Sequence, residues 1–327
     1  MRYPDGKMPF GGEEPAATIV VMTDTANTRI GWLDLPAAVR ARIEAIIGGG
    51  RVAEAVSQRG GFSPGTADRV RTETGRRAFV KAVCPAINVR SAELARMEIH
   101  VSGALPRTAP VPELLGAFDD GDWVVLVLED VDGAQPRTPW VEAEFDAALA
   151  ALAELADAVT PSPVGGLPTT AERLADDFAA WEIVAADPPA DLDPWLAERL
   201  TELCAAAKRS LDVLGTGNTL AHCDIRADNL LVRRDDGRVV IVDWPWGAIG
   251  PEWLDRLLLG INVRVHGGDP ARALTGIEPD VVTDFLAGLV GYFEYVGRLP
   301  PPPAIPTVRA FQRWQAEALR PWLRDRL

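Results

Sequence analysis

Two polar segments of the sequence carry the residues best suited to chemistry. In LAHCDIRADNLLV, Asp224 and Asn229 lie five positions apart around a turn. In VVIVDW, Asp243 ends an apolar strand, and the DDG turn at 235–237 pairs this strand with the one that follows Asn229. The pairing brings Asp243 close to Asn229. A carboxylate and an amide oxygen suit Mg²⁺, which takes few protein ligands, and Asp224 beside such a metal is placed to accept a proton from a hydroxyl group.

The spacing of these residues is more specific than their types. Asp224 or Asp228 taken alone reads as a loop carboxylate, and Asn229 as the start of a strand. The full pattern is His-x-Asp-x4-Asn, followed 14 residues after Asn229 by Asp243, which comes directly behind two apolar residues. The same spacing is found in the catalytic loop and the metal-binding aspartate of protein kinases.

With these motifs the sequence resembles the aminoglycoside phosphotransferase family, small-molecule kinases whose fold is similar to that of protein kinases. The family motif HxDxxxxN matches residues 222–229, its [IV]DW motif matches the end of 241–244, and the resemblance extends over residues 50–325. It implies that the γ-phosphate of ATP is transferred to a hydroxyl group of a small molecule, with ATP and Mg²⁺ as cofactors.

The resemblance also implies a role for each residue of these motifs. Asp224 corresponds to the catalytic base, and Asn229 and Asp243 correspond to the ligands of Mg²⁺. His222 corresponds to a structural support of the loop, and Asp255 to the aspartate that braces the loop from below. An exposed helix carboxylate is the alternative for Asp255.

Lys81 in FVKAV is the candidate cation for the phosphates of the nucleotide. A lone lysine in a strand usually points to solvent, but the resemblance places the family's phosphate-binding lysine on this third strand. That lysine needs a glutamate partner on the following helix, and the candidates are Glu93 and Glu98. At about 100° per residue, Glu98 lies closer than Glu93 to the apolar face of the helix predicted over 91–105. We therefore predict that Lys81 pairs with Glu98.

Two further nucleotide contacts follow from position along the chain. The turn GGFSPG places the backbone N–H groups of Gly60, Gly61 and Ser63 where they can meet phosphate, and a plain hairpin turn is equally consistent with it. The segment WVVLVLEDVDG resembles the family's strand and hinge, so that adenine is expected on the backbone of Glu129 and Val131.

The acceptor site is predicted on the helical part of the chain, where the family supplies it with acidic and aromatic residues. DDFAAWE contributes Asp176, Asp177, Trp181 and Glu182, and Trp246 follows the metal-binding motif closely. A solvated acidic helix face is the alternative for this segment. Together with the net charge of −14, these residues favour a neutral or cationic acceptor, because a negative field attracts cations.

Positioning these residues requires an α+β, protein-kinase-like fold with two lobes. We expect an irregular N-terminal arm over 1–35, a β-rich N-lobe with one main helix over 36–132, and a helical C-lobe that holds the catalytic loop, the metal site and the acceptor site over 133–327. The patterns of apolar residues predict strands over 51–58, 67–74, 76–83 and 123–130, and helices over 91–105, 141–158, 170–186, 193–213, 251–265, 278–297 and 306–327.

The composition of the chain argues against several other classes of protein. With 33 basic against 47 acidic residues, a nucleic-acid partner is not expected. No apolar run reaches the roughly 20 residues of a membrane span, no signal peptide is visible, and three cysteines are too few for a disulfide scaffold. A cytoplasmic location is expected.

The sequence therefore predicts an ATP-dependent phosphotransferase that acts on an aminoglycoside-like or amino-sugar-like alcohol. A kinase of another small metabolite, such as an amino alcohol, is the alternative within enzymes. A nucleotide-binding pseudoenzyme usually lacks one of the key residues, whereas Asp224, Asn229, Asp243 and Lys81 are all present. A protein kinase is not favoured, because the segment between Asp243 and Asp255 is too short for an activation segment.

Overall fold

The computed structural model describes residues 30–58, 64–302 and 305–327. The predicted phosphate contacts Gly60, Gly61 and Ser63 lie outside the described residues, as does the predicted arm up to residue 29. The described residues therefore include both motifs, 222–229 and 241–244, but not the turn between the first two strands.

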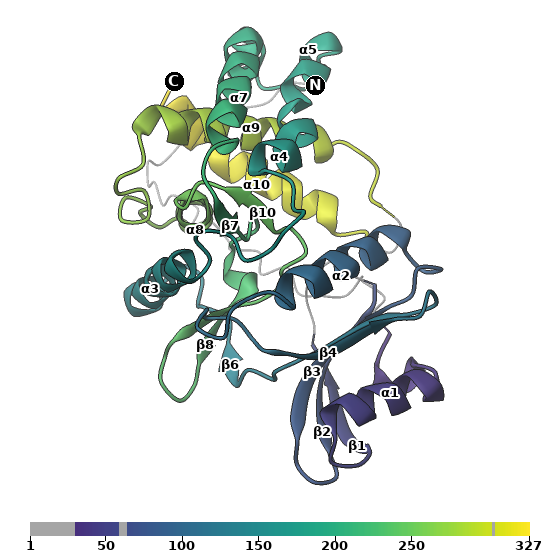
Figure 1. Cartoon of the computed structure of the whole chain (residues 1–327). Coiled ribbons are helices and arrows are strands. Elements are labelled where there is room, and N and C mark those ends of the chain that lie inside the picture. The colour runs from purple at the N-terminus through teal and green to yellow at the C-terminus, as the bar shows by residue number, and fades with distance from the viewer. Residues whose placement is uncertain (1–29, 59–63, 303–304) are drawn as a thin grey trace, which may run out of the picture.

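The N-lobe, the lower part of the molecule in Figure 1, is built on a five-stranded antiparallel sheet with the strand order β1-β2-β3-β5-β4. A short 3-10 helix and one α-helix precede the sheet, and a second α-helix lies between β3 and β4. The elements are η1 (Trp32–Asp34), α1 (Ala37–Ile47), β1 (Val52–Ser57), β2 (Thr66–Thr72), β3 (Arg77–Val83), α2 (Val89–Ser102), β4 (Leu114–Asp119) and β5 (Val124–Leu128).

The two helices of the N-lobe pack on the two faces of this sheet. In β3, Ala78, Val80 and Ala82 point to one face and join the buried cluster with α1. Val83 points to the other face, where it joins the cluster with α2. Because successive side chains in a strand alternate between faces, Lys81 shares the face of Val83 and points toward α2.

The C-lobe is mostly helical and contains two small sheets (Figure 1). Its largest buried cluster includes residues of α7 and α9. Its elements are β6 (Gly133–Ala134), α3 (Glu142–Ala158), α4 (Thr170–Phe178), α5 (Ala180–Ala186), α6 (Pro194–Glu198), α7 (Leu200–Leu214), β7 (Thr219–Ala221), η2 (Ala227–Asn229), β8 (Leu230–Arg233), β9 (Val239–Ile241), β10 (Ala248–Gly250), α8 (Leu254–Val265), α9 (Pro279–Val296) and α10 (Val308–Arg324).

The predicted hairpin between the two chemical motifs is present as β8 and β9. Leu230 pairs with Ile241 in antiparallel register, and one step further the N–H of Val242 donates to the C=O of Asn229 at 3.0 Å. This register places Asn229 next to the segment that carries Asp243. A second small sheet, β7 with β10, holds the start of the catalytic loop.

The predicted helix over 170–186 is divided at Ala179 into α4 and α5. Two glycines of α9 explain the break. A Cβ at Gly288 would meet the ring of Phe178 at 2.4 Å, and one at Gly291 would meet the Trp181 indole at 2.5 Å. The chain turns between α4 and α5 so that both aromatic rings pack into the space left by these glycines.

Trp181 is therefore a core residue, and the prediction that it lines the acceptor site is wrong. Its side chain is fully buried, and its indole N–H donates to the backbone C=O of Ala287 at 2.7 Å. An indole that is buried and has its N–H satisfied contributes packing energy, and it has no polar group left for a ligand.

The remaining differences from the predicted elements are small. Strand β4 was not predicted, and the segment predicted as one helix over 193–213 is split into α6 and α7. None of the helices in the described part of the chain combines the length and the apolar character that crossing a membrane would need. The observed arrangement is the α+β fold with two lobes that the sequence predicts.

Candidate active site

The catalytic loop leaves β7 at His222 and is held from below by one carboxylate. Asp255, at the start of α8, accepts hydrogen bonds from the backbone N–H groups of His222 at 2.7 Å and Cys223 at 3.0 Å. Its side chain is buried, so the alternative of an exposed helix carboxylate does not hold. Cys223 adopts a φ of 66°, a conformation that costs energy for a residue with a side chain and that these two hydrogen bonds stabilise.

His222 is fully buried and links the two motifs. One ring nitrogen lies 2.9 Å from the C=O of Val242, and the other lies 3.2 Å from the N–H of Asp224. Burial lowers the pKa of His222, against the opposing influence of Asp255. The ring is therefore neutral, with Nε2 donating to Val242 and Nδ1 accepting from Asp224. His222 supports the loop and has no lone pair free to move a proton.

Asp224 projects from this loop with a hydrogen bond to each carboxylate oxygen. Arg226 donates to Oδ1 at 2.7 Å, and the Asn229 amide donates to Oδ2 at 3.0 Å. Burial raises the pKa of Asp224 to about 6, although the nearby Arg226 guanidinium acts to lower it. The group is an ionised carboxylate at neutral pH, and its pKa lies close enough to neutrality for it to accept a proton.

Asn229 and Asp243 form a donor set that fits Mg²⁺. The Asn229 amide nitrogen donates to both the backbone C=O at 2.7 Å and the side chain of Asp224, which leaves its carbonyl oxygen available. Asp243 follows β9 with a φ of 71°, and its side chain is 43% exposed. One carboxylate and one amide oxygen, with room for phosphate and water, match the way in which this ion binds.

Lys81 and Glu98 face these groups from the N-lobe. The Lys81 ammonium lies 2.7 Å from Glu98 Oε1 and 2.5 Å from Asp243 Oδ1. Glu98 is the partner of Lys81, as the helix geometry predicted, whereas Glu93 pairs with Arg90. Burial acts to lower the pKa of Lys81, but the two carboxylates outweigh it and raise the pKa above its ordinary value. Lys81 is a permanent cation at the boundary between the lobes.

Glu129 and Val131 lie in the segment that connects the lobes directly after β5. The N–H of Glu129 donates to the C=O of Glu113 at 2.8 Å. Within the described ranges, no residue hydrogen-bonds to the C=O of Glu129 or to the N–H of Val131. These are one acceptor and one donor, the pair of groups that the predicted adenine contact requires.

Ion pairs fix this hinge segment (129–132) on both sides. On the N-lobe side, Asp130 binds Arg69 at 2.6 Å and Arg77 at 2.7 Å, and its side chain is only 3% exposed. On the C-lobe side, Glu129 binds Arg233 at 3.0 Å. These contacts attach the hinge segment to the sheet and to strand β8 at the same time.

The predicted acceptor residues are only partly brought together. Asp177 on α4 is half-buried, and no described residue forms a hydrogen bond or ion pair with it. Burial and the neighbouring Asp176 raise the pKa of Asp177 to about 6, although the Arg90 guanidinium acts to lower it. Asp176 is exposed, and Trp246 lies with its ring 5.6 Å from the Arg90 guanidinium. Glu182 is exposed on α5.

Tyr292 on α9 was not predicted and connects the acceptor residues to the catalytic loop. Burial raises the pKa of Tyr292 to about 12, and both Asp177 and Asp224 contribute in the same direction. The phenol is therefore within electrostatic reach of both carboxylates, and the amide of Gln312 on α10 lies 3.4 Å from it. The sequence offers little reason to assign Tyr292 to the site, because a tyrosine in an apolar helix is usually a core residue.

Arg226, Asp228 and Asn262 were also not assigned a role from the sequence. Arg226 and Asp228 form a side-chain network with Asp224. Asn262 of α8 is buried and accepts a hydrogen bond from the N–H of Ala227 at 3.3 Å, which makes it a second brace of the loop. The sequence pattern that could have predicted this network is a basic residue two positions after Asp224, followed two positions later by an acidic residue.

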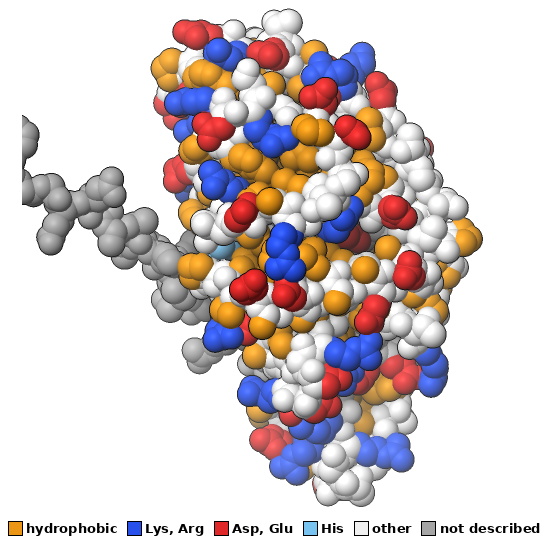
Figure 2. All heavy atoms as spheres, turned by 90° about the vertical axis from the view of Figure 1, so that its left-hand side faces the viewer, with side chains coloured by type: hydrophobic (Ala, Val, Ile, Leu, Met, Phe, Trp, Pro, Cys, Tyr) orange, Lys and Arg blue, Asp and Glu red, His pale blue; other side chains and the backbone are white. Residues whose placement is uncertain are grey.

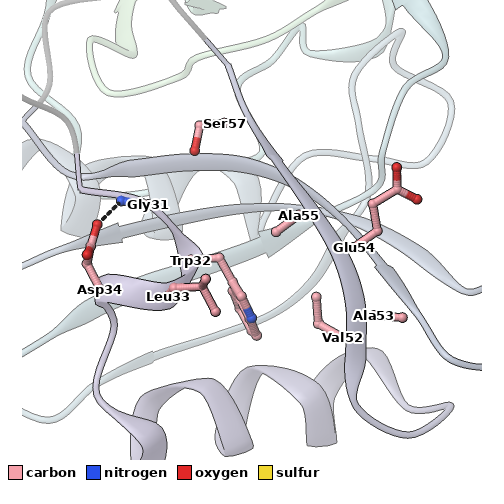
Figure 3. A pocket seen from close by; sticks show the side chains of 9 residues that line it. All are labelled: Gly31, Trp32, Leu33, Asp34, Val52, Ala53, Glu54, Ala55 and Ser57. Carbon is pink, nitrogen blue, oxygen red and sulfur yellow. Dashed lines mark hydrogen bonds between the residues drawn. The ribbon is translucent and has the colours of Figure 1, made fainter.

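A separate hollow of about 340 Å³ lies on the edge of the N-lobe sheet, between η1 and β1. In Figure 3 the Asp34 carboxylate is bonded to the N–H of Gly31, and Trp32 and Val52 lie in the middle of the view. None of the motif residues lines this hollow. On the face of the molecule in Figure 2, acidic and basic side chains are interspersed, so this face has no patch of a single charge sign.

The β-rich lobe pairs Lys81 of β3 with Glu98 of α2, and a hinge joins it to a helical lobe with an Asp–Asn–Asp set. This arrangement is typical of the class of kinase-like phosphotransferases. The particular family follows from the sequence: the model of the phosphotransferase enzyme family matches residues 61–273. The chain belongs to this family, whose members phosphorylate hydroxyl groups of small molecules, and it is a small-molecule kinase.

Solved structures support the fold at low sequence identity. The complex of aminoglycoside phosphotransferase APH(4)-Ia with AMP-PNP and hygromycin B is 13% identical, with a TM-score of 0.58 over 88% of this chain and 98% of that chain. The complex of APH(2")-IIia with GDP and kanamycin is 16% identical, with a TM-score of 0.58 over 89% and 98%. A choline kinase from Streptococcus pneumoniae is 15% identical, with a TM-score of 0.54 over 87% and 98%. No curated protein matches the chain in sequence.

Proposed function

We propose that the chain transfers the γ-phosphate of ATP to a hydroxyl group of an aminoglycoside-like or amino-sugar-like acceptor. The observation that carries this proposal is the Asp224 carboxylate, which is ionised, hydrogen-bonded on both oxygens and set beside the oxygen donors of Asn229 and Asp243. A carboxylate held in this way is placed to accept the proton of a hydroxyl group that attacks a phosphoryl group bound beside it.

The nucleotide is assigned to the boundary between the lobes. Adenine is expected to meet the free backbone groups of Glu129 and Val131, and the phosphates to meet Lys81, which Glu98 orients. Asn229 and Asp243 would hold Mg²⁺, which would offset the negative charge of the phosphates. Lys81 would exchange its present contact with Asp243 for one with the nucleotide.

The transfer itself needs positioning more than covalent chemistry from the protein. Asp224 Oδ takes the hydroxyl proton as the acceptor oxygen bonds to the γ-phosphorus, and the bond from that phosphorus to the β–γ bridging oxygen breaks, which releases ADP. The proton is held at Asp224 until it leaves to solvent. His222 stays neutral throughout and keeps the loop in place through Val242.

The acceptor is proposed to be neutral or cationic because its side of the site offers unpaired negative charge. Asp177 has no hydrogen-bond donor among the described side chains, so an ammonium or hydroxyl group of the acceptor can supply one. The solved relatives bind hygromycin B or kanamycin, or are choline kinases. A kinase of an amino alcohol is therefore the second candidate, and the same Asp177 favours it.

A coupled assay of ADP release across aminoglycosides, amino sugars, amino alcohols and hydroxyl-bearing peptides tests the proposal. We expect turnover with members of the first two groups that requires ATP and Mg²⁺. Turnover confined to amino alcohols would favour the second candidate, and turnover with peptides alone would contradict both. Asp224→Asn is the control for contaminating kinases, since their activity would be unchanged in a preparation of this variant.

A further inference from the structure

The Arg226 side chain makes three hydrogen bonds that connect two carboxylates of the catalytic loop. Its Nε and Nη2 donate to the two oxygens of Asp228, each at 2.9 Å. Its Nη1 donates to Oδ1 of Asp224 at 2.7 Å. A guanidinium is planar and its N–H groups have fixed directions, so the bidentate contact with Asp228 determines where Nη1 points.

Asp228 is a firm anchor because the backbone around it is itself fixed. It lies within η2, where the N–H of Asn229 donates to the C=O of Arg226 at 3.0 Å. The N–H of Ala227 donates to the buried Asn262 side chain of α8. The carboxylate of Asp228 is 41% exposed and forms no hydrogen bond with Asp224. Its charge raises the pKa of Asp224 directly, but its hydrogen-bonded link to the base, which can orient the carboxylate, runs through Arg226.

Asn229 completes the arrangement from the other side, since it donates to Oδ2 of Asp224 at 3.0 Å. Each oxygen of the base thus has one fixed donor, and the plane of the carboxylate is determined by two points. Arg226 is mostly buried, with 20% of its side chain exposed, and its guanidinium lies 5.5 Å from the ring of Phe311 on α10. Two fixed donors leave the remaining lone pair of each oxygen pointing in one direction.

We infer that Arg226 is a positioning residue for the phosphoryl transfer, which holds the Asp224 carboxylate in the orientation that meets the acceptor hydroxyl, and that Asp228 holds Arg226 in turn. The inference rests on the proposed function, because it assigns the orientation of the base in that reaction. Catalysis is sensitive to such an orientation, since a displacement of about 1 Å can lower a rate by about 10²-fold.

The test compares Arg226→Ala, Arg226→Lys, Asp228→Ala and the double Ala variant with the wild type. The measured quantities are kcat, KM for the acceptor, the affinity for MgADP and the melting temperature. The exposed ion pair between Arg272 and Asp146, at 54% and 50% exposure, supplies matched controls, because Arg272→Ala and Asp146→Ala remove the same groups away from the motif residues.

We expect Arg226→Ala to lower kcat by about 10²-fold while KM and the MgADP affinity stay near the wild-type values. Arg226→Lys should remain impaired, because one ammonium cannot bind Asp228 side-on and reach Asp224 as well. Added guanidinium ion at millimolar concentration should restore part of kcat in Arg226→Ala and in no other variant. A purely structural role would not respond to the added ion.

The double variant decides whether Asp228 acts through Arg226. If it does, Asp228→Ala lowers kcat in the wild-type background and costs nothing further in the Arg226→Ala background. Independent losses that multiply, or an Arg226→Ala variant with nearly normal kcat, would overturn the inference. A loss of MgADP affinity and melting temperature in step with kcat would also overturn it. An inactive wild type with every acceptor would instead refute the proposed function.

Discussion

The catalytic loop and the acceptor side of the site hold their polar groups in opposite ways. In the loop, Asp224, Asn229 and Asp255 each have partners within the protein at hydrogen-bonding distance. On the acceptor side, Asp177 is half-buried without such a partner among the described residues. The polar groups of the loop are thus held in place without a ligand, whereas the Asp177 carboxylate on the proposed acceptor side is left to bind one. In the proposed function, the phosphoryl transfer belongs to the first region and the choice of acceptor to the second.

The largest effect is expected from Asp224, the proposed base. Asp224→Asn keeps the size of the side chain and removes the proton acceptor, so kcat should fall by roughly 10²–10⁴-fold, while calorimetry should show nearly unchanged MgADP binding. Activity within about tenfold of the wild type would show that Asp224 is not the base. In that case the hydrogen bonds that hold Asp224 in the loop would have no role in catalysis, and the comparison with the acceptor side would lose its meaning.

The proposed metal ligands, Asn229 and Asp243, provide the second comparison, and both lie on the catalytic-loop side of the site. Asp243→Ala should weaken the binding of MgATP more than Asn229→Ala, by an additional factor on the order of ten, because a carboxylate brings a full charge to the ion and an amide only a dipole. Titration calorimetry of MgATP into both variants measures the difference. A parallel titration without Mg²⁺ is the control, and there the gap between the two variants should shrink. Equal losses would contradict the assignment.

The pH dependence is expected to show the buried base. Because the pKa of Asp224 is raised to about 6, protonation below that pH removes the acceptor of the hydroxyl proton. The value of kcat/KM should therefore rise about tenfold per pH unit below the pKa and level off above it. A pH profile of the wild type checks this. The low residual activity of Asp224→Asn should lack the same rise, and a rise that persists in this variant would point to another group.

The smallest effect is expected on the acceptor side. Asp177→Lys, and to a lesser degree Asp176→Lys, should raise KM for a cationic acceptor a few-fold and leave KM for ATP unchanged. KM for the acceptor should also rise between low and physiological ionic strength, where the field reaches only about 8 Å. Indifference of KM to both changes, or a best acceptor that carries a carboxylate, would show that these carboxylates merely face water.

The sequence predicts a site residue well when its position is set by neighbours along the chain, and poorly when it is set by packing against distant elements. The spacing of Asp224, Asn229 and Asp243 is local to one loop and one hairpin, so the motif and the pairing rules placed all three. The partnership of Lys81 with Glu98 followed from the family resemblance, which placed the lysine on the third strand, and from helix periodicity, which selected the glutamate. These are the parts of the site in which nearby positions along the chain determine the geometry.

The missed features depend on contacts between elements far apart in the sequence. Trp181 is buried because Gly288 and Gly291 leave space on α9, more than 100 positions later. Strand β4 has no clear alternation, since both of its faces are partly covered, and Gly116 allows α1 to approach so closely that a Cβ would meet Ile46 at 2.8 Å. No pattern within either segment predicts these contacts.

The ion pairs of the hinge have a consequence for how the molecule can move. Asp130 is bound by two arginines of the sheet, and Glu129, its neighbour in the chain, is bound by Arg233 of the helical lobe. Opening the lobes about this segment would separate Glu129 from Arg233, while the two pairs of Asp130, whose carboxylate is almost entirely shielded from water, keep the segment attached to the sheet. The connection therefore behaves as a stiff joint rather than a free pivot. Small-angle scattering profiles with and without nucleotide should nearly superimpose.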